Sequence, residues 1–138
     1  MKVDRKVKEE PYADKAGCTA CVVLVTETQI ICANAGDSRA VLFRGNEVIP
    51  LSDDHKPTNE GEKKRIEAAG MFVSDNGKVN KELAVSRAFG DYGLKNNNRE
   101  PTKNAVSAEP DFKILKRTDQ DDFIIVACDG LWDCKTNE

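Results

Sequence analysis

Phe123-Ile-Ile-Val-Ala-Cys-Asp-Gly-Leu-Trp-Asp133 is a stretch in which an apolar run stops abruptly at an acidic residue. Residues 123–128 are too few for a stable helix and too apolar for a half-exposed strand, so we predict a strand covered on both faces. Asp129 then lies at the end of that strand, and Gly130 allows a tight turn. If a helix follows, Asp129 and Asp133 lie one turn apart and can converge. The alternative is an ordinary strand, glycine turn and helix whose acids complement the helix dipole.

The length and composition limit the class of protein. The 138 residues suit one domain with one core, and 39% hydrophobic with 33% charged residues is typical of a globular protein with a charged surface. The net charge of −3 provides no basic surface for nucleic acid or anionic membrane. Because no apolar run exceeds the six residues at 123–128 and the N-terminus is charged, we expect neither a membrane span nor a signal peptide. The expected location is cytoplasmic or nuclear.

The odd number of cysteines argues against a secreted disulfide framework. The five cysteines lie at positions 18, 21, 32, 128 and 134. Cys18 and Cys21 have the spacing of a zinc or redox pair. They fall on an expected strand, however, where residues three apart point to opposite faces and cannot share one metal ion. We expect small, reduced and buried thiols.

Short apolar segments between turn-sized gaps dominate both ends of the chain. Residues 1–16 are polar and lack periodicity, so we expect a frayed lead-in and place the domain at 17–138. Three segments then predict an antiparallel meander, at about 19–26, 29–35 and 40–44, and a turn leads into a further short strand at 47–51. The last strands are expected at 112–116 and 123–128, joined by an acidic turn.

The middle of the chain combines one helix with turns and loops. A helix is predicted from Asn59 to about Ala69, with Asn59 and Glu62 as a capping box and Gly70 as its end. Asp75-Asn76-Gly77 predicts a short hairpin. The segment Leu83 to Asp91 fits either a short helix or an extended chain, and residues 92–110 read as a long polar loop.

A second predicted strand also ends in an acid beside a glycine. Ile30-Ile-Cys-Ala-Asn-Ala-Gly36 runs into Asp37. If the two strands are adjacent in one antiparallel sheet, Asp37, Asp129 and Asp133 lie together at one edge. Such carboxylates repel one another unless a cation neutralises them, and all-oxygen ligands select Mg²⁺ or Mn²⁺. The alternative is that these acids are solvated turn formers at strand ends.

Seven motifs occur in an order that resembles one known family. They are Gly17-Cys-Thr-Ala20, Gly36-Asp-Ser-Arg-Ala-Val41, Ser52-Asp-Asp-His-Lys-Pro57, Arg65-Ile-Glu-Ala-Ala-Gly70, Leu83-Ala-Val-Ser-Arg-Ala-Phe-Gly-Asp91, Glu109-Pro110 and Ala127-Cys-Asp-Gly-Leu-Trp-Asp133. Together they resemble the successive signatures of the metal-dependent type 2C protein Ser/Thr phosphatases. The resemblance covers nearly the whole chain from Gly17 onward.

The resemblance implies an α+β fold, part of a four-layer α-β-β-α sandwich with two antiparallel sheets and Mg²⁺ or Mn²⁺ in a cleft at one edge. It implies hydrolysis of phosphoserine and phosphothreonine on protein substrates by a metal-activated water. Asp129 resembles a ligand of the catalytic metal pair, and Asp37 and Asp133 resemble its partners at a further, weaker metal site. Arg87 is a candidate substrate contact or, alternatively, one half of a structural ion pair. Structural roles at turns and strand ends are expected for Arg39, Asp54, His55 and Asp91.

Several family segments have no counterpart here. These are the upstream strand with a metal-binding glutamate, the Asp-Gly-His-Gly-Gly segment with the helices after it, the substrate arginine near the N-terminus, and the last strand with its metal-binding Asp-Asn pair. We therefore expect weak or no activity from this chain alone and open sheet edges that favour self-association. Three alternatives follow: a phosphatase fragment, a non-catalytic phosphatase-like module that binds partners, or a plain structural α+β domain.

Overall fold

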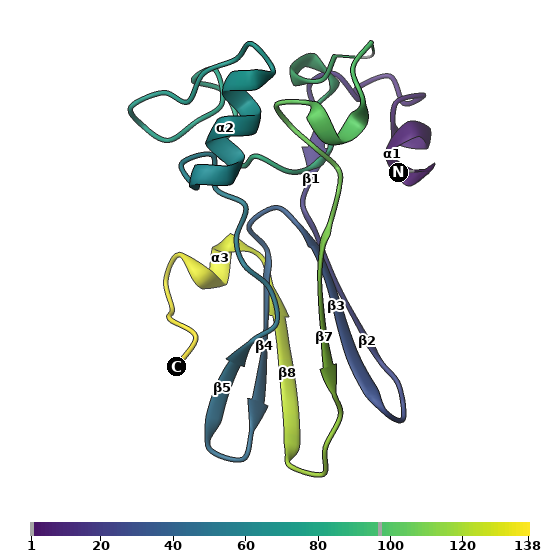
Figure 1. Cartoon of the computed structure of the whole chain (residues 1–138), viewed down its shortest axis with the longest axis vertical. Helices are drawn as coiled ribbons and strands as arrows, with labels where there is room; N and C mark the ends of the chain where they lie inside the picture. The colour runs from purple at the N-terminus through teal and green to yellow at the C-terminus, as the bar shows by residue number, and fades with distance from the viewer. Residues whose placement is uncertain (1, 97) are drawn as a thin grey trace. The chain divides into compact units, whose positions relative to one another are not determined.

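The computed structural model describes residues 2–96 and 98–138. The chain forms two compact units. Figure 1 labels their helices and strands. Unit 1 comprises residues 1–19 and 55–109, and unit 2 comprises residues 20–54 and 110–138. Each unit has its own cluster of buried apolar side chains. Helices and antiparallel sheets are both present, which confirms the predicted α+β class.

Unit 2 consists of two antiparallel three-stranded sheets and one short helix. The first sheet has the order β2-β3-β7, with β2 at Ala20–Val25, β3 at Gln29–Ala35 and β7 at Asp111–Lys116. The second has the order β5-β4-β8, with β4 at Arg39–Arg44, β5 at Glu47–Pro50 and β8 at Asp121–Ala127. The helix α3 follows β8 at Asp129–Trp132. Pro50 ends an edge strand, where its missing N–H costs no ladder hydrogen bond.

The core of unit 2 lies between these two sheets. Ile30 and Cys32 from β3 and Ala40 and Leu42 from β4 are each at most 1% exposed and belong to one cluster. On both strands the buried residues are two apart, as the pleat requires for one inward face. The two sheets therefore form two layers over a shared apolar core.

The predicted meander is wrong at the step from β3 to β4. These consecutive strands belong to different sheets, because the short link of residues 36–38 carries the chain from one layer to the other. The strands ending near Asp37 and Asp129 are consequently not neighbours in one sheet, since β3 pairs with β7 whereas β8 pairs with β4. Crossing layers buries the inward faces of β3 and β4 against each other, which a flat meander cannot do.

The prediction that residues 123–128 are covered on both faces is also wrong. Phe123, Ile125 and Val126 of β8 are 54%, 43% and 47% exposed. Only the inward-facing Ile124 packs against the shared core. β8 lies at the edge of its sheet. An unbroken apolar run in the sequence does not by itself indicate which faces of a strand are covered.

Unit 1 holds the remaining elements. They are α1 at Lys2–Val7, β1 at Gly17–Cys18, α2 at Glu60–Ala68, β6 at Phe89–Gly90 and the 3₁₀ helices η1 at Tyr92–Leu94 and η2 at Pro101–Lys103. Ile66 of α2, Val79 and Val106 are fully buried in its core. Between residues 83 and 91 the chain is extended or irregular, not helical. Across both units, none of the described helices is long and apolar enough to cross a membrane.

The predicted capping box of α2 does not form. The Asn59 side chain makes no capping hydrogen bond, and Glu62 is turned inward at 7% exposure instead of reaching back to the helix start. The other end agrees with the prediction, because Gly70 follows the helix with a φ of +83°. The spacing of Asn59 and Glu62 fits a capping box, but the buried hydrogen-bonding partners of Glu62 determine where its carboxylate lies.

The expected irregular lead-in contains the helix α1, and its Asp4 is only 6% exposed. The Asp4 carboxylate accepts hydrogen bonds from the Gly90 N–H at 3.0 Å, the Tyr92 hydroxyl at 2.9 Å and the Lys95 ammonium at 2.9 Å. Burial lowers the pKa of Lys95, and its contact with Asp4 opposes that shift. A buried pair of this kind is costly to break, because the remaining charge would be left without a partner.

Two glycines allow β1 and β6 to pair closely. Gly17 lies opposite Gly90 in this short ladder, and Gly90 has a φ of +75°. A Cβ at Gly90 would lie 2.3 Å from the carbonyl oxygen of Ala16, so neither the space nor the backbone conformation accepts a side chain.

We predict that Gly90→Ala lowers the free energy of unfolding by at least about 2 kcal/mol, because the added methyl group must displace backbone. Chemical denaturation monitored by circular dichroism measures this change. Gly61→Ala is the control, since nothing lies within 4 Å of a Cβ there. The control should change stability by less than about 1 kcal/mol and in the stabilising direction. Equal effects of the two substitutions would contradict the steric explanation.

Candidate functional site

The pairing of β4 with β8 brings two of the predicted metal ligands to the same end of one sheet. Arg39 is the register partner of Ala127 in this antiparallel ladder. Asp37 precedes Arg39 by two residues and Asp129 follows Ala127 by two, so both acids extend beyond the same end of the ladder. Asp37 is 6% exposed, whereas Asp129 is exposed. The predicted proximity of these strand ends therefore arises through β4, not through β3.

The helix α3 brings Asp129 and Asp133 within one turn of each other. Asp129 is its first residue and Asp133 its C-cap, and the Asp133 N–H donates to the Asp129 carbonyl at 2.8 Å. Residues separated by four positions lie on the same side of a helix. The helix considered at this point of the sequence is present, but it begins at Asp129, spans a single turn and leaves both acids exposed.

Arg39 supplies the positive charge next to these acids. Its Nε and Nη2 donate to the two carboxylate oxygens of Asp54 at 2.9 Å each, and its Nη1 donates to Asn137 Oδ1 at 2.6 Å. The hydrogen bonds to Asp54 raise the pKa of Arg39, and the charges of Asp133 and Asp37 add to this effect. Asp37 and Asp133 thus lie within electrostatic range of the same guanidinium. The structural role predicted for Arg39 and Asp54 agrees with this geometry.

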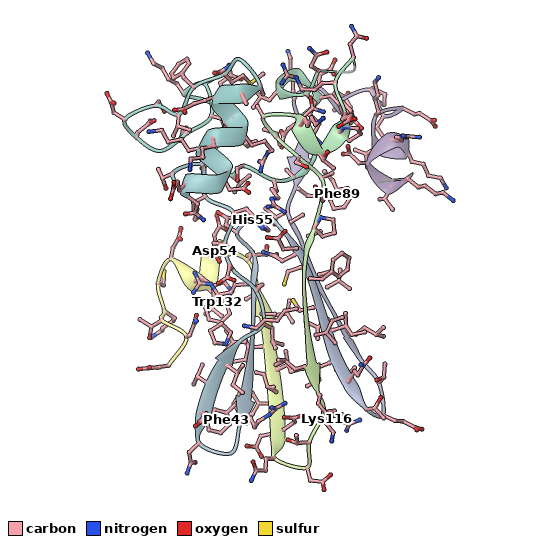
Figure 2. All side chains as sticks on the ribbon, viewed as in Figure 1. Phe43, Asp54, His55, Phe89, Lys116 and Trp132 are labelled. Atoms are coloured by element: carbon pink, nitrogen blue, oxygen red, sulfur yellow. The ribbon has the colours of Figure 1, made fainter. Side chains whose placement is uncertain are left out.

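Trp132 fixes α3 against the sheet. Its Nε1 donates to the carbonyls of Ala127 at 2.9 Å and Arg39 at 3.2 Å, and the Arg39 guanidinium lies 5.3 Å from the centre of its ring. Figure 2 shows Trp132 and Asp54 toward one end of the β5-β4-β8 sheet and Phe43 toward the other. The cation–π contact and the two hydrogen bonds hold the acidic helix at the end where Asp37 lies.

The donor set fits a hard divalent cation in its chemistry. Asp37, Asp129 and Asp133 offer only carboxylate oxygens, which suit Mg²⁺ or Mn²⁺ better than softer metals. Among residues 2–96 and 98–138, no three His, Cys, Asp or Glu side chains are gathered closely enough to hold a metal ion. Metal binding by these three residues therefore stays a prediction.

In unit 1, Arg87 takes part in a buried ion-pair network around Glu62. Its Nη2 donates to Glu62 Oε1 at 2.8 Å and its Nη1 to the Glu109 carbonyl at 3.0 Å. Arg65 lies 2.8 Å from Glu62 Oε1, and the Ser86 hydroxyl also donates to Glu62. Burial alone would raise the pKa of Glu62, but the hydrogen bonds from Arg65, Arg87 and Ser86 lower it to about 2. The structural ion pair, which was the alternative role for Arg87, is therefore present. Contact between Arg87 and a substrate stays a prediction.

Two further residues occupy the structural positions expected of them. His55 is 4% exposed, and its carbonyl accepts hydrogen bonds from the N–H and the hydroxyl of Ser86 at 3.0 and 2.9 Å. Asp91 has a φ of +50° and donates its N–H to the Ala16 carbonyl at 2.9 Å. Burial raises the pKa of Asp91, and the charge of Lys95 opposes that rise.

The sequence reveals neither the partners of Arg87 nor the contact between Cys21 and Cys32. The spacing from Asn59 predicts a helix cap at Glu62, although an acid three residues before Arg65 also suggests an ion pair on one helix face. Cys18 is exposed, whereas Cys21 Sγ lies 4.0 Å from Cys32 Sγ on the neighbouring strand. The expectation of buried thiols is therefore wrong for Cys18, and the absence of a shared site at Cys18 and Cys21 stays a prediction.

Comparisons with known proteins identify the family. The model of the protein phosphatase 2C family matches residues 1–138. A protein phosphatase 2C homolog from Schizosaccharomyces pombe is 55% identical over 127 residues, which is 92% of this chain and 30% of that protein. The solved structure of a C. elegans sex determining protein matches with a TM-score of 0.82 at 26% identity, covering 98% of this chain and 32% of that one.

A serine-threonine phosphatase 2C from Toxoplasma gondii matches with a TM-score of 0.78 at 26% identity, covering 99% of this chain and 47% of that structure. The chain belongs to the protein phosphatase 2C family, as its motifs predicted. It spans about a third of the length of the curated relatives it matches, from 30% to 38%.

We predict that Glu62→Gln lowers the free energy of unfolding by about 3 kcal/mol near pH 6, because the neutral amide leaves buried arginines without their counter-charge. Since the folded pKa of Glu62 is about 2 and the ordinary value is 4.5, this stabilisation is complete above pH 4.5 and fades as the pH falls toward 2. Urea denaturation between pH 2 and pH 7 measures the difference in the free energy of unfolding between the wild type and Glu62→Gln.

Glu60→Gln on the same helix is the matched control. Glu60 is 83% exposed and pairs with Lys64 across one turn, so its loss should cost less than about 0.5 kcal/mol. The electrostatic explanation would be contradicted if the difference in the free energy of unfolding between the wild type and Glu62→Gln did not change with pH.

Proposed function

We propose that this chain is part of a protein phosphatase that hydrolyses phosphoserine and phosphothreonine on proteins with the help of Mg²⁺ or Mn²⁺. The observation that carries the proposal is the match to the protein phosphatase 2C family over residues 1–138. The arrangement of the acidic motifs supports it, because Asp37 and Asp129 extend beyond the same end of the β4–β8 ladder.

In this proposal Asp129 contributes to the catalytic metal pair, and Asp37 and Asp133 join it at a further, weaker site. Bound there, the ions would lower the pKa of a water molecule and polarise the phosphoryl group. The chain's own contribution is to position oxygen ligands. Trp132 anchors α3 through two hydrogen bonds to carbonyl groups, and Arg39 balances part of the negative charge of the acids.

Arg87 is the proposed contact for the substrate phosphate. A guanidinium fork matches the oxygen spacing of a phosphate group. Glu62 and the Glu109 carbonyl already accept hydrogen bonds from this guanidinium and fix its orientation. Contact with a phosphate would therefore use a pre-oriented group, which loses less side-chain entropy than a mobile arginine.

The expected partners are phosphorylated proteins in the cytoplasm or nucleus. Because the chain spans about a third of its curated relatives, we propose that the 138 residues alone have weak or no activity. Val22 on β2 and Phe112 on β7 are 61% and 67% exposed, and both strands lie at sheet edges. Such apolar edges favour self-association.

A phosphopeptide assay tests the proposed function. The 138-residue chain and a longer protein that includes the family's segments on both sides are each incubated with a phosphothreonine peptide and Mn²⁺, with and without chelator. We expect chelator-sensitive phosphate release by the longer protein and little or none by the 138 residues. Robust phosphate release by the 138-residue chain would refute the prediction that it has weak or no activity alone. A longer protein that is folded but releases no phosphate would refute the phosphatase assignment.

We predict that Asp129→Asn in the longer protein weakens Mn²⁺ binding at least about tenfold, because the metal loses a charged oxygen ligand. Electron paramagnetic resonance of free Mn²⁺ measures the affinity directly. Asp119→Asn removes the same charge from an exposed loop residue and should leave the affinity unchanged. Unaltered Mn²⁺ affinity in the Asp129→Asn protein would remove this residue from the ligand set.

A further inference from the structure

Unit 1 contains a pocket of about 630 Å³ that is lined mainly by polar and charged residues. The lining residues come from α1 and the turn after it, from η1 and η2, and from the loops next to these 3₁₀ helices. All of them belong to unit 1. The volume is about twenty times the ~30 Å³ that one water molecule occupies in the liquid. The pocket therefore has room for a small charged group and for the side chain that carries it.

The lining of this pocket carries more positive than negative charge. Its charged side chains are four cations and two carboxylates, namely Arg5, Lys8, Lys95, Arg99, Asp4 and Glu9. Burial and the contact with Asp4 raise the pKa of Tyr92 to about 12, so its hydroxyl adds no charge near pH 7. The whole chain has a net charge of −3, so this excess of two positive charges is a local feature that favours a dianion.

Lys95 and Asp4 satisfy each other in the buried part of the lining. The Lys95 ammonium lies 2.9 Å from Asp4 Oδ1, and the two side chains are 3% and 8% exposed. A ligand has little access to either group, and together they contribute no net charge. The cations that a ligand can reach are therefore Arg5, Lys8 and Arg99, opposed by Glu9 alone, and the excess of two positive charges is unchanged.

These three cations have N–H donors to offer. Arg5 and Lys8 are exposed, and neither side chain makes a hydrogen bond or an ion pair within the part of the chain that the structure describes. The Lys8 ammonium lies 5.7 Å from the centre of the Tyr92 ring, which keeps it beside the pocket. Arg99 donates through Nη1 to the Ala68 carbonyl at 2.9 Å, which leaves its Nε and Nη2 to donate elsewhere.

Asn104 adds a neutral donor whose position is fixed. It is 7% exposed, and its Oδ1 accepts the backbone N–H of Asn96 at 2.8 Å, which identifies the other end of the amide as Nδ2. This Nδ2 has no acceptor among residues 2–96 and 98–138. It is not enclosed either, because Asn34 Oδ1 is the one described side-chain atom that is both buried and without a partner. The pocket thus offers an ordered and accessible N–H donor.

We propose that this pocket binds the phosphate group of a phosphorylated serine or threonine side chain from a partner polypeptide. Such a group carries a charge of about −1.5 to −2 at pH 7, which matches the excess positive charge of the lining, whereas a carboxylate carries only −1. Arg5, Lys8 and Arg99 supply charge-assisted hydrogen bonds to the phosphate oxygens, and Asn104 Nδ2 supplies a neutral one. The proposal does not depend on the proposed phosphatase activity, because it uses neither the predicted metal ligands nor Arg87.

The test is a nuclear magnetic resonance titration of the metal-free, isotope-labelled chain with N-acetylphosphothreonine amide. We expect saturable shifts of the Asn104 side-chain amide and of the backbone amides of Arg5 and Arg99, with a dissociation constant of roughly millimolar size. Arg5→Gln should weaken binding at least about fivefold, because a charge-assisted hydrogen bond is lost. Lys6→Gln is the matched control, since Lys6 is an exposed residue of the same helix that does not line the pocket, and it should weaken binding much less.

Asn104→Asp examines the neutral donor separately. The aspartate keeps the shape of the side chain and the acceptor for the Asn96 N–H, but it replaces Nδ2 with a negatively charged oxygen. We expect this variant to lose saturable binding of the phosphothreonine compound. Unchanged affinity in both Asn104→Asp and Arg5→Gln would overturn the proposal.

Three further results would also overturn it. N-acetylglutamate amide that binds as tightly as the phosphothreonine compound would refute recognition of a doubly charged phosphate. Equal affinity for inorganic phosphate would show a site for the free ion and not for a phosphorylated side chain. Shifts confined to Ser86 and Arg87 would place the ligand at the proposed substrate contact instead. An absence of saturable shifts up to about 50 mM ligand would likewise reject the proposal.

Discussion

The hydrogen bonds of Arg39 connect the parts of unit 2 on which the candidate site depends. The guanidinium joins the start of β4 to Asp54 after β5 and to Asn137 near the C-terminus, and it lies over the ring of Trp132 of α3. The side chains of Arg39 and Asp54 are 23% and 17% exposed, so the pair avoids most of the desolvation cost of a fully buried one. Since Asp37 and Asp133 lie in the field of the same cation, one residue both organises the acids and reduces their mutual repulsion.

Unit 1 uses charge differently, because its ion pairs are more deeply buried. Lys95 and Asp4 have side chains only 3% and 8% exposed, and Glu62 is enclosed by two arginines and a serine. Each of these carboxylates accepts at least three hydrogen bonds, which compensates for the loss of water. Such networks require a particular arrangement of several backbone segments. They therefore add to the fold of unit 1 a geometric requirement that its apolar cluster does not impose.

Local patterns in the sequence predicted strands, turns and the family well, but not the pairing of distant segments. The sequence predicts the strands at Gln29–Ala35 and Arg39–Arg44 to within one residue, since a short apolar run between turn residues is a local signal. Their assignment to separate sheets depends on which faces bury each other, and no local pattern contains that information. For the same reason Glu62 was read as a helix cap, because Ser86 and Arg87 lie more than twenty residues away in the chain. The strand ends that carry Asp37 and Asp129 do lie at one end of a sheet, although through a different pairing, and metal binding there stays a prediction.

Trp132 is the single tryptophan of the chain, and this gives the acidic end of the sheet its own optical reporter. Its indole N–H is shared between two carbonyl groups and its ring faces a guanidinium, so its emission depends on contacts that exist only when α3 is docked. Undocking of this helix would expose the indole to water while leaving the two-sheet core intact. Tryptophan fluorescence can therefore follow the local order of one helical turn separately from global unfolding, without any introduced label.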